Sequence, residues 1–357
     1  MPVSGGSRRE GAASADDGGP EGGGARPGRA DGSGPSAEHI STPPRTGDSE
    51  IERPGPATRA ALVAIVGRAN VGKSCLLNAL LGEKVSIESP VAQTTRTVIR
   101  GILTEPRGQL AFLDTPGIHA ARNDFGRQMN RMARAAVEGV DIALLVLDSS
   151  RSPESEDVGW MRRLAGHGSD AALVFALNKR DLGGAGIPAL RAAWAEAFAQ
   201  AAAPPPAPDW IEVSAKTGAG VEALRAALFA RAPEQPPLFP PDVLSDHPRQ
   251  LAIADVVREK LFLRLRDEIP HRVATAVEHL VETPDERRAT VAVYVERASQ
   301  KGIVIGYKGR MLRAVRRAAE AELQRMFGEP IALDLIVRVE PNWTKNYWFL
   351  KRIGYLP

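Results

Sequence analysis

The stretch Gly67-Arg-Ala-Asn-Val-Gly-Lys-Ser74 decides the fold of this chain. It follows an apolar run at 61–66 with the composition of a buried strand, and it leads into residues 73–81, which have the composition of a helix. Strand, G-x-x-x-x-G-K-S and helix, in this order, form a loop whose glycines let successive backbone N–H groups point at one phosphate chain. The stretch therefore predicts a nucleoside-triphosphate site.

The chemistry of this loop assigns a role to each end of it. The helix that begins near Lys73 adds the positive end of its dipole. Lys73 is expected to reach the β- and γ-phosphates, and the Ser74 hydroxyl to bind Mg²⁺. The predicted phosphate-binding residues of the loop are Gly67, Arg68, Ala69, Asn70, Val71, Gly72, Lys73 and Ser74.

The composition of the chain narrows its class. A length of 357 residues predicts two domains and a tail, and there is no run of 18 apolar residues that would predict a membrane span. The single cysteine, Cys75, excludes an internal disulfide. Residues 1–58 contain almost nothing large and apolar, so we expect a disordered extension. They lack an apolar signal core and carry many acids, which argues against a targeting peptide.

The first folded domain is expected at residues 59–232. Short apolar stretches alternate there with longer amphipathic ones, which predicts an α/β sheet covered on both faces. The expected strands are 61–66, 98–104, 109–113, 141–147, 171–177 and 209–213, and the expected helices are 73–81, 126–138, 154–166, 187–202 and 220–231.

Asp114-Thr-Pro-Gly117 directly follows the strand expected at 109–113. An Asp at the end of a strand beside the phosphate loop can hold Mg²⁺ through water. The Gly117 N–H can contact the γ-phosphate, so the segment would change shape when that phosphate leaves. We therefore add Asp114, Thr115, Pro116 and Gly117 to the phosphate site.

The loop Ala92-Gln-Thr-Thr-Arg-Thr97 lies between these two motifs. A threonine here is expected to bind Mg²⁺ when the γ-phosphate is present. Thr94 and Thr95 both fit this role, and we assign Thr95, the residue before Arg96. The alternative is that both are ordinary polar loop residues.

Asn178-Lys-Arg-Asp181 closes the strand expected at 171–177 and predicts recognition of guanine. An Asp carboxylate accepts hydrogen bonds from N1–H and the 2-amino group, a pair that only guanine offers. Asn178 would serve the other edge of the base and hold loops together, the Lys179 stem would lie on the ring, and the Ala215 N–H would bond O6. The predicted guanine-binding residues are Asn178, Lys179, Asp181, Ser214, Ala215 and Lys216.

The order of these motifs resembles that of a Ras-like GTPase domain. Many such enzymes orient the attacking water with a Gln after the Asp-x-x-Gly segment. Ile118 stands there and cannot polarise water. In GTPases that resemble this one, an Asn at the position of Asn70 ligates K⁺; the alternative is that Asn70 only shapes the loop. The residues assigned to hydrolysis are Lys73, Asn70, Thr95 and Gly117.

The second domain is expected at 248–357, after a proline-rich linker at 233–247. Its expected elements are a helix at 250–267, strands at 271–283, 289–297 and 331–339, and a basic helix at 310–327. Gly306-Tyr-Lys-Gly309 lies between the strand-like residues 303–305 and that basic helix. A G-x-x-G loop lets a sugar-phosphate backbone approach closely, which predicts a KH-type RNA-binding module. The assigned residues are Gly306, Tyr307, Lys308, Gly309, Arg310, Arg313 and Arg317.

The aromatic residues of the tail at 343–355 allow two interpretations. We prefer a closing helix that packs on the sheet over direct stacking on bases.

Together, the motifs resemble the Era family of bacterial ribosome-assembly GTPases. The features that carry the resemblance are Gly67–Ser74, Ala92–Arg96, Asp114–Gly117, Asn178–Asp181, Val304–Gly309 and Leu350-Lys-Arg-Ile-Gly-Tyr355. The resemblance implies a GTPase domain joined to a type II KH domain, with Mg²⁺ as cofactor. It also implies binding near the 3′ end of 16S ribosomal RNA, a role in maturation of the 30S subunit, and a cytoplasmic protein that is partly peripheral at the inner membrane face.

Two other functions remain open at this stage. One is a signalling GTPase whose second domain binds a protein or an anionic membrane surface. The other is an ATP-using enzyme, which Asn178 and Asp181 disfavour. We expect a monomer with no DNA partner that alternates between GTP and GDP.

Overall fold

The computed structural model describes residues 58–89, 99–117, 124–166, 170–201, 206–283 and 285–356. Almost all of the expected disordered tail lies outside these ranges, as do Thr94, Thr95 and Ile118. The described residues from Thr58 onward belong to one compact unit. Within the described ranges, no helix is long and apolar enough to cross a bilayer.

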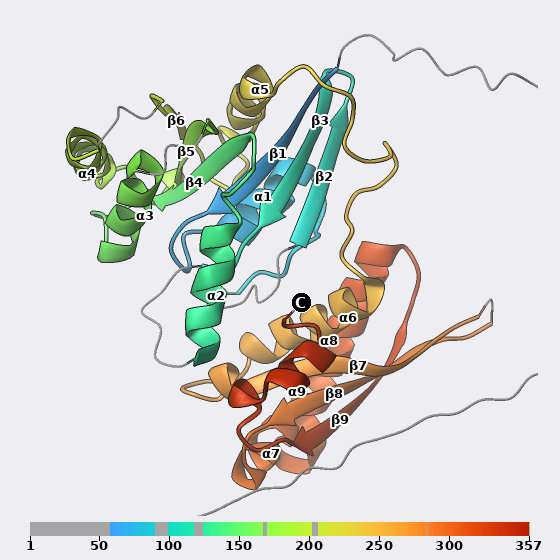
Figure 1. The fold of residues 1–357 in the computed structure, drawn as a ribbon. Coiled ribbons are helices and arrows are strands. Elements are labelled where there is room, and N and C mark those ends of the chain that lie inside the picture. The colour runs from blue at the N-terminus through green and yellow to red at the C-terminus, as the bar shows by residue number, and fades with distance from the viewer. Residues whose placement is uncertain are drawn as a thin grey trace, which may run out of the picture. The chain divides into compact units, whose positions relative to one another are not determined.

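The first domain is built on a six-stranded sheet (Figure 1). Its strands are β1 (Arg59–Val66), β2 (Ile99–Glu105), β3 (Gly108–Asp114), β4 (Ile142–Asp148), β5 (Ala172–Asn178) and β6 (Asp209–Glu212). They lie in the order β2-β3-β1-β4-β5-β6, and β2 runs antiparallel to β3 while the other neighbours are parallel. All six expected strands are confirmed, and the parallel arrangement brings the ends of β1, β3, β4 and β5 to the same edge.

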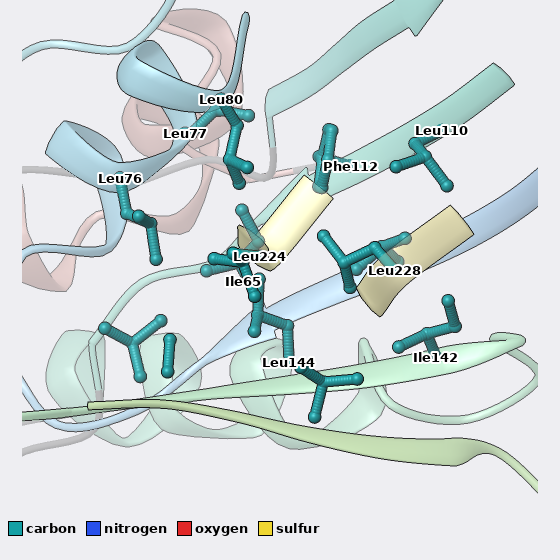
Figure 2. Packing of buried hydrophobic residues seen from close by; sticks show 14 of the residues in the cluster. Ile65, Leu76, Leu77, Leu80, Leu110, Phe112, Ile142, Leu144, Leu224 and Leu228 are labelled. Atoms are coloured by element: carbon teal, nitrogen blue, oxygen red, sulfur yellow. The ribbon is translucent and has the colours of Figure 1, made fainter. Parts of the chain in front are cut away.

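Helices cover both faces of this sheet, as expected. Helices α1 (Lys73–Leu81) and α5 (Val221–Arg231) pack on one face, where Leu76, Leu224 and Phe112 meet in the core shown in Figure 2. Helices α2 (Asp124–Ala135), α3 (Ser155–Gly166) and α4 (Ile187–Ala199) pack on the other. Each fully buried Leu or Phe contributes about 1.5–3 kcal/mol of burial free energy. Helix α2 begins two residues before the expected start and ends three residues before the expected end.

The second domain has the element order of a type II KH fold. Its elements are α6 (Arg249–Phe262), β7 (Val273–Glu282), β8 (Arg287–Val295), α7 (Ala298–Ile305), α8 (Arg310–Phe327) and β9 (Ala332–Val339). The strands form a sheet in the order β7-β8-β9, with β7 antiparallel and β9 parallel to β8. Residues from α6, α7 and α8 pack on one face of this sheet, and Val256, Val304 and Val315 are fully buried there.

One expected element is wrong. The residues 303–305 read as strand-like because they are β-branched, but they form the last turn of α7. Two local signals favour the helix. Gln300 accepts hydrogen bonds from the backbone N–H groups of Glu296 and Arg297, which caps the start. Gly306, with φ 72°, ends the helix and donates its N–H to the Gly302 carbonyl.

The tail packs on the other face of the KH sheet, which confirms the preferred interpretation for Trp343, Phe349 and Tyr355. The short turn η4 (Trp343–Lys345) and helix α9 (Tyr347–Arg352) place Trp343 and Phe349 against Ala292 and Tyr294 of β8. Tyr355 completes this cluster and accepts a hydrogen bond of 2.7 Å from the buried guanidinium of Arg258. Two aromatic side chains of α9, Tyr347 and Trp348, remain outside the cluster.

Candidate functional site

The phosphate loop joins β1 to α1 in a conformation that requires both of its glycines. Gly67 has φ 146°, and a Cβ there would lie 2.5 Å from the Val146 carbonyl oxygen. Gly72 has φ 97°, and a Cβ there would lie 2.4 Å from Asn178 Nδ2. Both contacts are closer than side chains tolerate, so the loop can only curl in this way around bare backbone.

Lys73 lies buried inside the loop. Its Nζ donates to the carbonyls of Gly67 and Arg68 at 3.2 and 3.0 Å. Burial lowers its pKa to about 8, while the nearby Asp114 carboxylate acts in the opposite direction. A phosphate chain in the loop would supply the negative charge that this ammonium group needs when it is buried.

The other side chains of the phosphate loop have different environments. Arg68 pairs with Asp157 and Glu154 at the start of α3, with nitrogen–oxygen distances of 3.1 Å in both pairs. Val71 is buried in the core, so only its backbone is available to a ligand. Asn70 is exposed and has φ 62°, a conformation that Asn tolerates better than most residues.

Asp114, the last residue of β3, accepts hydrogen bonds from two serine hydroxyls. The hydroxyls of Ser74 and Ser86 each donate to its Oδ2 at 2.8 Å. A serine hydroxyl beside a carboxylate is a hard oxygen donor set, the kind that Mg²⁺ prefers. The residues present therefore fit the predicted magnesium site.

The rest of the Asp-x-x-Gly segment divides into a structural part and a part beside the phosphate loop. Thr115 is fully buried and donates its hydroxyl to the Ile65 carbonyl at 2.8 Å, so its side chain secures the segment to β1. At Gly117, a Cβ would lie 2.8 Å from Lys73 Nζ and 2.7 Å from the Ala69 Cα. Only glycine allows this approach between the two motifs.

The predicted guanine residues come together at the ends of β5 and β6. Asn178 donates to the Val71 carbonyl at 2.8 Å and accepts from the Ala215 N–H at 3.0 Å, so its amide joins three loops. The Ser214 hydroxyl donates to Asp181 Oδ1 at 2.7 Å and orients that carboxylate. The structure shows the loop-holding role of Asn178, and its contact with the base stays a prediction. The Ala215 N–H, which we assigned to guanine O6, donates to Asn178 in this structure.

Sequence reasoning missed Asp148, which positions Lys179. Lys179 has φ 65°, and its Nζ lies 2.8 Å from Asp148 Oδ2. Burial raises the pKa of Asp148, but hydrogen bonds from Lys179 and Ser150 outweigh burial and hold it below its usual value. A signal was available, because Asp148 ends a buried strand just as Asp114 does.

The loop at 306–309 exposes bare backbone surrounded by cations. Gly306 and Gly309 have φ near 72° and 73°, Lys308 has φ 49°, and a Cβ on Gly306 would lie 2.6 Å from Met311 Cβ. Tyr307 is 69% exposed. The charged groups of Lys308 and Arg310 lie 5.5 and 5.0 Å from the centre of its ring. Arg313 and Arg317 are exposed on the following turns of α8.

Fold and site together define the class: a Ras-like P-loop GTPase domain followed by a KH domain. A family model described as a 50S ribosome-binding GTPase matches residues 62–179, and a KH-domain model matches residues 268–344. Both matches fall inside the domains expected from the sequence.

Curated relatives identify the family within this class. The chain is 39% identical over 300 residues to GTPase Era of Synechocystis, a match that covers 83% of this chain and 92% of that protein. It is 40% identical over 299 residues to GTPase Era of Geobacter sp. strain M21, covering 83% and 98%. The chain belongs to the Era family and is a GTPase.

Solved structures agree with this assignment. A crystal structure of Era with MgGDPNP and nucleotides 1506–1542 of 16S ribosomal RNA matches with a TM-score of 0.77 at 31% identity, covering 84% of this chain and all of that one. A point variant of Aquifex aeolicus Era bound to GDP·AlF4⁻ matches with a TM-score of 0.76 at the same identity and coverage.

Proposed function

We propose that this GTPase binds 16S ribosomal RNA near its 3′ end through the KH loop, under control of the bound guanine nucleotide, and thereby assists maturation of the small subunit. The observation that carries the proposal is the Gly306–Gly309 loop, with its left-handed backbone, exposed cations and adjoining helix α8. The related Era that is bound to 16S rRNA nucleotides supports the choice of RNA.

The nucleotide half of the proposal assigns roles to residues of this chain. Lys73 and the loop N–H groups hold the phosphates, and Asp181 reads the base. Ser74, Asp114 through water, and Thr95 hold Mg²⁺, which neutralises charge on the phosphates when bound; Thr95 lies outside the described residues. The contact between Gly117 and the phosphate loop gives the site a segment that can respond to the γ-phosphate.

A chain of polar contacts connects this site to the KH helices. Lys84 Nζ lies 2.7 Å from Glu259 of α6 and 3.0 Å from Glu322 of α8, and these partners raise its pKa against the effect of burial. The Glu88 N–H donates to Glu259 at 3.1 Å. Ser86, between Lys84 and Glu88, donates to Asp114. These contacts support a coupling in which a rearrangement at Asp114 reaches Glu322 of α8 through Ser86 and Lys84.

The proposal is tested by crosslinking and sequencing of bound RNA. The full chain would be loaded in parallel with a non-hydrolysable GTP analogue and with GDP. We expect reads to concentrate at the 3′ end of 16S rRNA and to be enriched in the GTP-analogue sample. Reads spread evenly over all RNA in both states, or binding to anionic vesicles in place of RNA, would contradict the proposal.

We also propose that K⁺ held at Asn70 supports hydrolysis, because Ile118 cannot orient water. Positive charge near the β/γ bridge stabilises the transition state, so we expect turnover about tenfold faster in K⁺ than in Na⁺. Asn70→Gly suits the left-handed backbone (φ 62°) and removes the side-chain ligand. It should lose the K⁺ stimulation and keep its GDP affinity. Equal turnover of the wild type in both salts would contradict this assignment.

A further inference from the structure

Helix α9 presents two aromatic side chains away from its own domain. Trp348 is 76% exposed and Tyr347 is 48% exposed. Their neighbours on the same short helix, Phe349 and Leu350, are buried against the KH sheet and fix the orientation of the helix. The exposed pair is therefore carried by a well-packed helix. Packing of the tail does not explain why these two rings face solvent.

The two rings are ordered relative to each other. Their centres lie 5.4 Å apart, and their planes make an angle of 79°, an edge-to-face arrangement. Such contacts favour one orientation of an exposed ring. A tryptophan that is held in this way and remains three-quarters exposed can stack with a planar ligand without first becoming ordered.

The charged side chains in the chain segment that carries the pair are all positive. Lys345, Lys351 and Arg352 lie within four residues of Trp348 in the chain and are exposed. Residues 341–357 contain no Asp or Glu. Aromatic platforms interleaved with cations are the recurring unit of single-strand nucleic-acid binding, in which rings take the bases and cations the phosphates.

We propose that Trp348 stacks on a base of single-stranded RNA at a second contact, separate from the Gly306–Gly309 loop, with Tyr347 supporting the ring and Lys345, Lys351 and Arg352 binding the flanking phosphates. This inference rests on the proposed function and adds a contact that requires no particular base. Single-stranded RNA accounts for the exposed aromatic pair better than a lipid surface does. A membrane-binding helix needs a broad apolar face, and the apolar face of α9 is buried in its own domain.

Tryptophan fluorescence provides a direct test. Trp160, Trp194 and Trp343 are buried, and Trp210 is half-buried. The red edge of the emission therefore reports on Trp348. The full chain would be titrated with a single-stranded 3′-terminal 16S rRNA fragment and with poly(U). We expect quenching of the red-edge emission in the wild type. Trp348→Ala should weaken binding about five- to hundredfold, the loss expected for one base–aromatic stack.

Two matched variants control this test. Trp348→Phe keeps a ring and should retain most of the affinity. Val281→Ala changes another exposed apolar residue of the KH domain and should bind like the wild type. RNA binding that depends on Lys308 and Arg310 but leaves both the emission and the Trp348→Ala affinity unchanged would overturn this inference and leave the proposed function intact. Absence of RNA binding would overturn both, and a blue shift seen only with phosphatidylglycerol vesicles would assign the patch to lipid.

Discussion

Replacing Asp181 with Asn is expected to abolish the preference of this GTPase for guanine nucleotides. A carboxylate offers two acceptors to the N1–H and 2-amino group of guanine. The amide places an NH₂ donor against one of these donors, and the charge that strengthens both bonds is lost. We expect GDP affinity to fall about 10³-fold, somewhat less than the roughly 10⁴–10⁵-fold discrimination of sites built around such hydrogen bonds, because the amide oxygen still accepts from one of the two donors.

The measurement is a competition of GDP, ADP and XDP against a fluorescent guanine nucleotide. XDP carries an oxygen in place of the 2-amino group, so it should bind the variant better than GDP does. Ser214→Ala is the matched control, because it removes the 2.7 Å hydrogen bond that orients Asp181 and a 3.2 Å bond from the Thr217 N–H, and leaves the Asp181 carboxylate itself in place. It should weaken GDP binding about tenfold or less and keep the order of preference. Unchanged discrimination between GDP and ADP in Asp181→Asn would contradict the guanine assignment.

The fold was largely predictable because its buried strands are nearly continuous apolar runs. The strands β4 and β5 are examples, and their bounds shifted by one residue from those expected. Prediction from local secondary-structure propensity failed where tertiary packing determined the structure. Residues 303–305 are β-branched, yet Val304 is buried at a helical position and Gly306 ends that helix.

The site was predictable to the level of motifs, but contacts between motifs were not. A loop sequence identifies Asn178 and Lys179. It does not show that Asn178 is occupied with Val71 and Ala215, or that Lys179 is held by Asp148 from the neighbouring strand. These partners are distant in sequence, and only the packing of parallel strands brings them together. The Ser86 contact with Asp114 could not be inferred for the same reason.

The Lys308→Ala, Arg310→Ala double variant is expected to cause the largest loss of RNA binding. Both side chains are exposed at the glycine loop, so we expect them to contribute to RNA binding through their charge and not to the stability of the fold. Each phosphate contact on a single strand contributes about 0.7 to the slope of log K against log salt. We expect the slope to fall by about 1.4 and the affinity to fall ten- to hundredfold at moderate salt.

The measurement is binding of the 3′-terminal 16S rRNA fragment at four or more salt concentrations, with the protein held in one nucleotide state. Arg288→Ala is the matched control. It removes an exposed arginine of the same domain that is already paired with Glu286 and Asp334, so the salt slope should stay unchanged. GTP turnover without RNA should be the same in all three proteins. A double variant that keeps the wild-type affinity and slope would show that the loop does not hold the RNA backbone, whatever else the KH domain binds.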